Sequence, residues 1–300
     1  MSKHLGTFGL LIVAIIWGMG FVANEVALDT MTPMQILGGR FLIAAILMCS
    51  IALIKKVKTE KNELFAGIVL GIFLFAGFAT QTIGLKYTTP SKNAFLTAAN
   101  VVIVPFIAFM IYKKKVDKFS ITGALLAIFG IGILSLNGNL TLGLGDGLTL
   151  ICAVSFAFQI FFTGEYVKKY NVLALNAIQM TVAFVLSLAT ILVTGETNLT
   201  FTQDGLTSTL YLGVLSTTVA FFLQTLFQKY TDQTTAAVVL SMESVFGTLF
   251  SVLIVGENIT PRMVIGSTLI LAAVITAETK LSWLFDYRKI KNPKIEAEME

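Results

Sequence analysis

The sequence is poor in charged residues. Asp, Glu, Lys and Arg make up only 13% of its 300 residues, and apolar residues make up 56%. A soluble domain carries roughly 25% charged residues, so this chain has too few to coat a globule of its size in water. The composition predicts an integral membrane protein. It excludes a secreted disulfide scaffold, a nucleic-acid-binding module and a disordered chain as the main class.

Histidine and cysteine are almost absent. The one histidine, His4, lies in the N-terminal tail, which excludes a Ser-His-Asp triad, an HExxH zinc site and a His-ligated haem within the fold. The two cysteines, Cys49 and Cys152, lie far apart in apolar runs, and we interpret both as buried thiols. We therefore expect no catalytic residues, no metal and no cofactor, and a protein that is not an enzyme.

Long apolar runs occupy most of the chain. A helix needs about 20 apolar residues to cross the roughly 30 Å core of a bilayer. Ten segments satisfy this: 6–28, 33–54, 63–85, 92–112, 119–136, 146–165, 172–194, 206–228, 233–255 and 262–280. The short loops leave no room for a soluble domain. We predict an all-α integral membrane protein, with one transmembrane domain over residues 1–280 and a cytoplasmic tail over 281–300.

Basic residues gather at one end of these segments. With the N-terminus inside, 17 of the 21 Lys and Arg residues lie in the inner segments, whereas Lys86, Lys92 and Arg262 lie outside and Arg40 lies within the membrane. Cytoplasmic loops carry an excess of Lys and Arg. The sequence therefore predicts a multi-pass protein of the bacterial inner membrane with both termini in the cytoplasm.

The two halves of the sequence resemble each other. A first register aligns 14–17 with 153–156 and Arg40 with Gln179; a second register, slightly shifted, aligns 81–82 with 224–225, 86–88 with 229–231, and Asn100 with Glu243. Each half holds five segments. Because five is odd, the second half enters the membrane in the opposite direction. We predict two inverted five-helix repeats, 6–136 and 146–280, an arrangement typical of transporters with a central site.

Several motifs resemble EamA-type members of the drug/metabolite transporter superfamily. They are Trp17-Gly18 with Phe21, Pro33 and Arg40-Phe41; Leu85-Lys86-Tyr87-Thr88 with Pro105; and Met242-Glu243-Ser244-Val245 with Gly256-Glu257, Thr260-Pro261 and Gly266. The resemblance covers about residues 6–280 and implies a ten-helix carrier of small organic metabolites, often an exporter. Ser244 stands where the family usually has proline, which argues against a kink in the ninth helix.

Two ionisable residues stand deep in the predicted membrane segments. Glu243 lies near the middle of the ninth segment, and Arg40 lies seven residues into the second. Charged groups at this depth are costly and tend to be functional. Glu243 could accept a proton, bind a cationic substrate group or pair with Arg40. Arg40 could bind a substrate carboxylate or tie the bundle together, with Glu25 as a second possible partner.

Uncharged polar residues recur at helical spacing in the other segments. Amides do not face hydrocarbon without partners, so these side chains either join helices by hydrogen bonds or line a polar cavity between the halves. Trp17 and Phe156 could wall such a cavity or pack in the core. The candidate substrate-binding or coupling residues are Glu243, Arg40, Trp17, Asn24, Asn100, Gln81, Gln159, Gln179 and Gln224.

These observations predict a secondary transporter that exports small organic metabolites, such as amino acids, by alternating access of the two repeats. Its partners would be a small-molecule substrate, protons and the lipid bilayer, and no nucleic acid. Proton-coupled efflux of cationic drugs, uptake of another solute class and a channel are the alternatives. No ATP-binding motif is found, so a solute or ion gradient would supply the energy.

Overall fold

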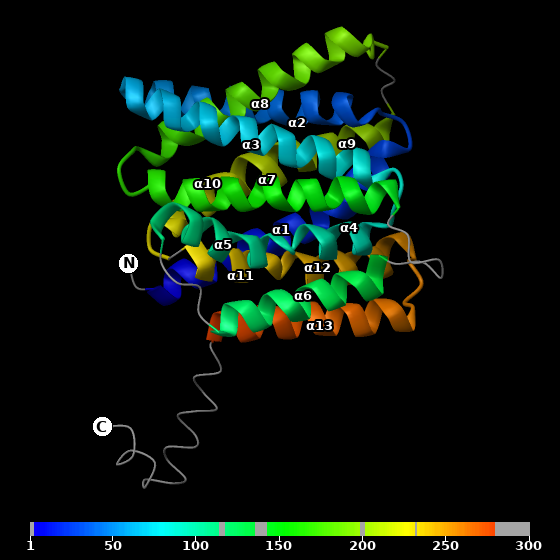
Figure 1. Cartoon of the computed structure of the whole chain (residues 1–300). Coiled ribbons are helices and arrows are strands. Elements are labelled where there is room, and N and C mark those ends of the chain that lie inside the picture. Colours follow the sequence, from blue (N-terminus) through cyan, green and yellow to red (C-terminus); the bar gives the residue numbers. More distant parts are fainter. Residues whose placement is uncertain (1–2, 114–117, 136–142, 199–201, 232, 280–300) are drawn as a thin grey trace, which may run out of the picture.

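The computed structural model describes residues 3–113, 118–135, 143–198, 202–231 and 233–279, and these parts contain helices and no strand (Figure 1). In chain order the helices are α1 (Lys3–Leu28), α2 (Pro33–Ile54), α3 (Lys61–Leu85), α4 (Pro90–Thr97), α5 (Asn100–Tyr112), α6 (Lys118–Ser135), α7 (Leu144–Tyr166), α8 (Val172–Thr194), α9 (Gln203–Tyr211), η1 (Leu212–Val219), α10 (Ala220–Gln228), α11 (Gln233–Ser241), α12 (Glu243–Phe250), η2 (Ser251–Val255) and α13 (Pro261–Thr279). The two η elements are π-helical.

Most of these elements form long helical segments that are suited to a bilayer. We call each such segment a rod, whether it is one helix or several helices joined end to end. Eight rods are long and apolar enough to cross a membrane: Leu5–Leu28, Pro33–Ile54, Lys61–Leu85, Pro90–Tyr112, Leu144–Tyr166, Val172–Thr194, Gln203–Gln228 and Gln233–Val255. The chain is therefore a multi-pass membrane protein. Helices α6 and α13 lie side by side at one edge of the bundle (Figure 1). The predicted tail, 281–300, lies outside the described residues.

Short capping motifs explain where several rods begin. Thr32, Thr89 and Thr202 are N-caps whose hydroxyl accepts a backbone N–H of the first turn, and Asn171 does the same with its amide oxygen. Proline follows Thr32 and Thr89, at the helix position where its missing N–H costs nothing. Local sequence therefore sets these boundaries, and the predicted bounds 33–54 and 172–194 coincide with α2 and α8.

Two rods are interrupted near their middle. Helix α4 gives way to α5 at Asn100, and α11 gives way to α12 at Glu243. At the breaks, backbone bonds run to the carbonyl three residues back, such as Val101 N to Ala98 O at 3.1 Å and Val245 N to Met242 O at 3.0 Å. Serine in place of proline does not keep the ninth segment continuous, contrary to the expectation, because the tighter turn interrupts it without proline.

Helices from the first half pack mainly on helices from the second. Helix α3 packs on α7 and α8, while α1 packs on α10 and α2 packs on η1. In the same way α4 and α5 pack on α7, and α11 and α12 pack on α1. Elements at corresponding places in the two halves thus make corresponding contacts. We use the term N-terminal side for the end of the bundle where α1 begins, at the left in Figure 1.

Glycine allows the closest of these approaches. At the crossing of α3 and α8, a Cβ atom on Gly71 would lie 2.6 Å from Val182 Cβ and 2.9 Å from the Gln179 carbonyl oxygen. Gly67 lies one turn earlier, and a Cβ atom there would lie 2.6 Å from Ile178 Cβ. Small residues at such crossings let two backbones pack closely in a membrane.

We expect Gly71→Ala to lower the free energy of unfolding by about 1–3 kcal/mol, because the added methyl group overpacks this crossing. Gly147→Ala is the control, since a Cβ atom there meets nothing within 4 Å. Thermal unfolding of purified protein in detergent would measure both. Equal melting temperatures for the two variants would contradict the close packing of α3 on α8.

Candidate functional site: a cavity between the two halves

A cavity lies between helices of the two halves. Its polar lining comes from α1, α2, α3, α5, α7, η1 and α12, and its main remaining walls are aromatic. The polar lining residues are Asn24, Arg40, Gln81, Asn100, Gln159, Ser216 and Glu243, and the aromatic ones are Trp17, Phe21, Phe78, Phe156 and Phe221. Seven of the nine candidate site residues therefore line one cavity, although they are scattered over most of the sequence.

Arg40 is fully buried beside the cavity. Its Nε donates to Thr217 Oγ1 at 2.9 Å and its Nη2 to Ser216 Oγ at 3.4 Å, while Nη1 has no partner in the described structure. The Phe78 ring lies beneath the guanidinium, with its centroid 3.9 Å from Cζ. The charge is therefore held by hydroxyl groups and an aromatic face.

No ion pair joins Arg40 to Glu243 or to Glu25 in the described residues. The two pairings considered from the sequence are therefore wrong for this conformation. The hydroxyl groups of Ser216 and Thr217 take the place of a carboxylate. Sequence reasoning missed these two residues, because single hydroxyl side chains are common in membrane helices and usually bond to their own backbone.

Glu243 and Asn100 occupy equivalent places at the two helix breaks. Each is the first residue of its half-helix, α12 or α5, and they are 6% and 3% exposed. N–H groups of the first turn are paired across both breaks, for example Val102 N with Ala99 O at 3.1 Å and Phe246 N with Met242 O at 3.1 Å. The breaks thus place a carboxylate in one half and an amide in the other at equivalent positions of the cavity lining.

Four aromatic rings pack together along the cavity wall. Ring centroids are 4.9 Å apart for Trp17 and Phe221, 5.0 Å for Phe78 and Phe156, and 5.8 Å for Phe78 and Phe221. Trp17 Nε1 donates to the Ser216 carbonyl oxygen at 2.9 Å, which fixes the indole. Phe78 and Phe221 are matched by the second of the two registers that align the halves. This match between the halves is the sequence feature that could have identified these two rings as part of the cavity wall.

A chain of amide side chains stands behind one wall. Gln224 Nε2 donates to Gln159 Oε1 at 3.2 Å, Gln159 Nε2 to Gln179 Oε1 at 3.4 Å, and Gln179 Nε2 to Asn176 Oδ1 at 2.9 Å. Of these four residues only Gln159 lines the cavity. Gln179 and Gln224, which are among the candidate site residues, therefore touch Gln159 and do not face the cavity in this conformation.

The cavity offers unused hydrogen-bonding atoms of both kinds. Arg40 Nη1 is a buried donor, and Asn24 Oδ1 and Asn100 Oδ1 are buried acceptors, and none has a partner in the described structure. Buried polar atoms are nearly always paired, so exceptions call for an explanation. A solute that carries both acceptors and donors would satisfy them. No cluster of three His, Cys, Asp or Glu side chains suited to a metal occurs among the described residues.

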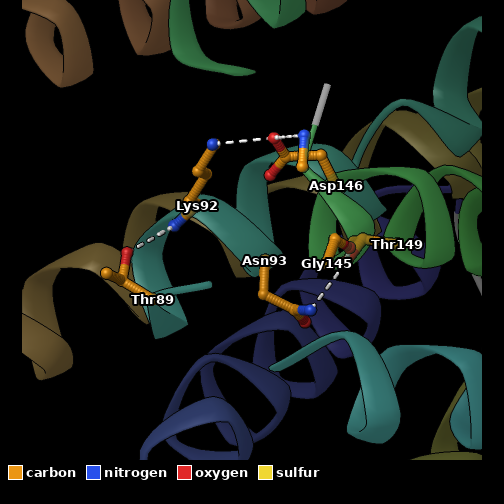
Figure 2. Close-up of polar contacts among 7 residues, drawn as sticks. Thr89, Lys92, Asn93, Gly145, Asp146 and Thr149 are labelled. Atoms are coloured by element: carbon orange, nitrogen blue, oxygen red, sulfur yellow. Dashed lines mark hydrogen bonds and ion pairs between the residues drawn. The ribbon is translucent and has the colours of Figure 1, made fainter. Parts of the chain in front are cut away.

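Helix α4 is held in place by polar contacts on the side opposite the N-terminal side. Lys92 Nζ lies 2.9 Å from Asp146 Oδ2, and Asn93 Nδ2 donates to Thr149 Oγ1 at 2.8 Å. These contacts tie α4 to the start of α7 (Figure 2). Asp146 Oδ2 also accepts the N–H of Gly143. These contacts fix the half-helix that precedes the break at Asn100.

The model of one protein family matches nearly the whole chain. The EamA-like transporter family model matches residues 4–136 and, separately, residues 143–278. The chain belongs to the EamA-like transporter family. This confirms the resemblance drawn from the sequence motifs.

Relatives of this EamA-family chain are described as transporters. The chain is 35% identical to an uncharacterized transporter of Archaeoglobus fulgidus, over 94% of this chain and 88% of that one. It is 26% identical to a probable amino-acid metabolite efflux pump of Escherichia coli, over 94% and 97% of the two chains. A solved crystal structure with 15% identity has a TM-score of 0.73 and covers 94% of this chain and 99% of that one, which shows a shared fold.

We expect Thr217→Val to lower the free energy of unfolding by about 2 kcal/mol, because it removes the acceptor of Arg40 Nε from a buried, charged group. Thr218→Val is the matched control, since the Thr218 hydroxyl bonds only to Gly213 O in the same rod. Titration of purified protein from mild detergent into dodecyl sulfate, followed by circular dichroism, would compare them. An equal loss of unfolding free energy in both variants would contradict the role of Thr217 as the acceptor that stabilises Arg40.

Proposed function

We propose that this protein is a secondary transporter that exports small organic metabolites, such as amino acids, by alternating access of its two halves. The observation that carries the proposal is the cavity. It brings Arg40, held without a carboxylate, together with Glu243 and the unpaired acceptors of Asn24 and Asn100. An α-amino acid carries a carboxylate for the guanidinium fork and an ammonium group for the carboxylate and amide oxygens.

We infer ten membrane crossings arranged as two inverted repeats, 6–136 and 146–280, within one domain of residues 1–280. The family model matches each half separately, and corresponding elements of the halves make corresponding contacts. In this arrangement α6 and α13 supply the fifth and tenth crossings. The excess of Lys and Arg on the N-terminal side supports cytoplasmic termini in a bacterial inner membrane.

Each candidate residue has a role in the proposed cycle. Arg40 holds the solute carboxylate, and Glu243 binds the ammonium group or carries a proton in its absence. Asn24, Asn100 and Gln81 supply neutral polar contacts around them, and Trp17 walls the apolar part of the solute. Gln179 and Gln224 orient Gln159 at the cavity wall.

The aromatic walls and Glu243 would also suit proton-coupled efflux of a cationic drug. That alternative is weaker, because Arg40 places a positive charge in the same cavity. A channel is disfavoured because the seven polar lining residues are all buried. The polar residues that line an open pore are exposed to water. Uptake differs from export only in direction and is separated from it by experiment.

We expect Glu243→Gln to abolish or reduce export at least about tenfold, since a charge-assisted contact with the solute or a proton carrier is lost. Cells that express wild type, Glu243→Gln or the control Asp204→Asn at matched membrane levels would be compared with empty vector. Mass spectrometry of the medium gives the readout. The control keeps activity because Asp204 is an exposed residue of α9.

Wild type and control should enrich the same metabolite in the medium. A metabolite depleted from the medium would replace export by uptake. Profiles of all four strains that match one another would refute export of endogenous metabolites.

Alternating access also requires the side at α4 to open, and we propose that α4 moves away from α7 when it does. Asp146→Asn keeps an oxygen that caps Gly143 N–H but removes the charge that binds Lys92. We expect this variant to increase thiol labelling of an Asn24→Cys reporter from that side by several-fold. Asp29→Asn is the control, since Asp29 is an exposed residue of the same side. Equal labelling in both variants would exclude this opening.

A further inference from the structure

A row of unused oxygen atoms lies between α7 and α10, outside the cavity. Thr163 Oγ1, Gln224 Oε1 and Gln228 Oε1 are buried and have no hydrogen-bond partner in the described structure. The three residues are each 0% exposed. Amide oxygens can only accept hydrogen bonds, and the threonine hydroxyl can accept as well. The row therefore presents acceptors to an occupant that must bring donors.

Hydrogen bonds fix the position of this row relative to the cavity. Gln224 Nε2 donates to Gln159 Oε1 and Gln228 Nε2 donates to the Ile160 carbonyl oxygen, each at 3.2 Å. Gln159 and Ile160 both line the cavity. Gln228 lies one helical turn beyond Gln224, a rise of roughly 6 Å toward the N-terminal side. The row thus starts at the cavity wall and leads away from it.

The start of α11 contacts the end of α7, on the N-terminal side of Thr163. Gln233 Nε2 donates to Glu165 Oε1 at the end of α7. A Cβ atom on Gly164 would lie 2.6 Å from Gln233 Cγ, so α11 and α7 touch there without a gap. Along α7, Thr163 thus lies between Gln159 and Ile160 of the cavity wall and the contact with α11.

Correspondence between the halves supports the same interpretation. The first register, which aligns Arg40 with Gln179, also aligns Asn24 with Thr163, and the second register aligns Gln81 with Gln224. Asn24 and Gln81 line the present cavity, and Asn24 Oδ1 is also unpaired. The second half thus holds its own set of acceptors at the places equivalent to cavity residues of the first half.

We propose that Thr163, Gln224 and Gln228 form a second subsite, which receives a primary ammonium group of the solute on the N-terminal side of the cavity. This inference rests on the proposed transport function. An ammonium group carries three N–H donors and no acceptor, which matches a row of acceptors. An anionic group would bring only further acceptors to the row and would be disfavoured there.

Thiol labelling tests the subsite without knowledge of the solute. In a Cys49→Ser, Cys152→Ala background, Thr163→Cys would be compared with Thr225→Cys, whose native hydroxyl is already bonded to Phe221 O within α10. Membrane vesicles that expose the N-terminal side would receive 2-aminoethyl methanethiosulfonate, which carries ammonium, or the 2-sulfonatoethyl reagent. Gel filtration would confirm that each variant is folded, and Gln228→Cys would serve as a second reporter.

We expect the ratio of ammonium to sulfonate labelling rates to be at least about tenfold higher at Thr163→Cys than at Thr225→Cys, the size of effect that one charge-assisted contact gives. Equal ratios, or no labelling at either reporter of the row, would overturn the subsite. The readout needs no transport. Loss of selectivity with intact export therefore refutes the subsite alone, whereas absent export with intact selectivity refutes the proposed function alone.

Discussion

A bilayer supplies no water to satisfy polar groups, and this constraint organises the molecule. Backbone groups are satisfied within helices, and where a helix is interrupted, as at Asn100 and Glu243, the break is enclosed by the bundle and faces the cavity. Polar side chains follow the same rule. Most of those in the bundle bond to a neighbouring helix or to their own backbone, and three of the buried atoms without a partner in the described structure belong to cavity residues, Asn24, Arg40 and Asn100.

The two halves place equivalent residues around the cavity but differ in charge. Trp17 and Phe156 correspond, as do Phe78 and Phe221, and all four line the cavity. The charges break this correspondence, because Arg40 is matched by Gln179 and Glu243 by Asn100. Equivalent scaffolds let two related half-structures alternate around one site. The unequal charges place a guanidinium from one half and a carboxylate from the other in the same cavity lining.

Polar contacts that hold the half-helices before the two breaks are different in kind. On one side an ion pair, Lys92 with Asp146, joins α4 to α7. On the N-terminal side Gln233 of α11 meets Gly164 and Glu165 of α7. Both contacts thus join a half-helix that precedes a break to α7, one at the start of α7 and one at its end.

The sequence by itself determined the membrane class, the helical segments, the likeness of the halves and the depth of Arg40 and Glu243. These follow from local hydrophobicity, caps such as Thr32, and spacing along the chain. Only the tertiary structure decided which polar residues meet. Arg40 bonds to Ser216 and Thr217, which belong to the other half of the sequence, and not to Glu243. Likewise Gln179 and Gln224 lie behind Gln159. Partner choice depends on the rotation and depth of packed helices, and periodicity along one helix does not contain that information.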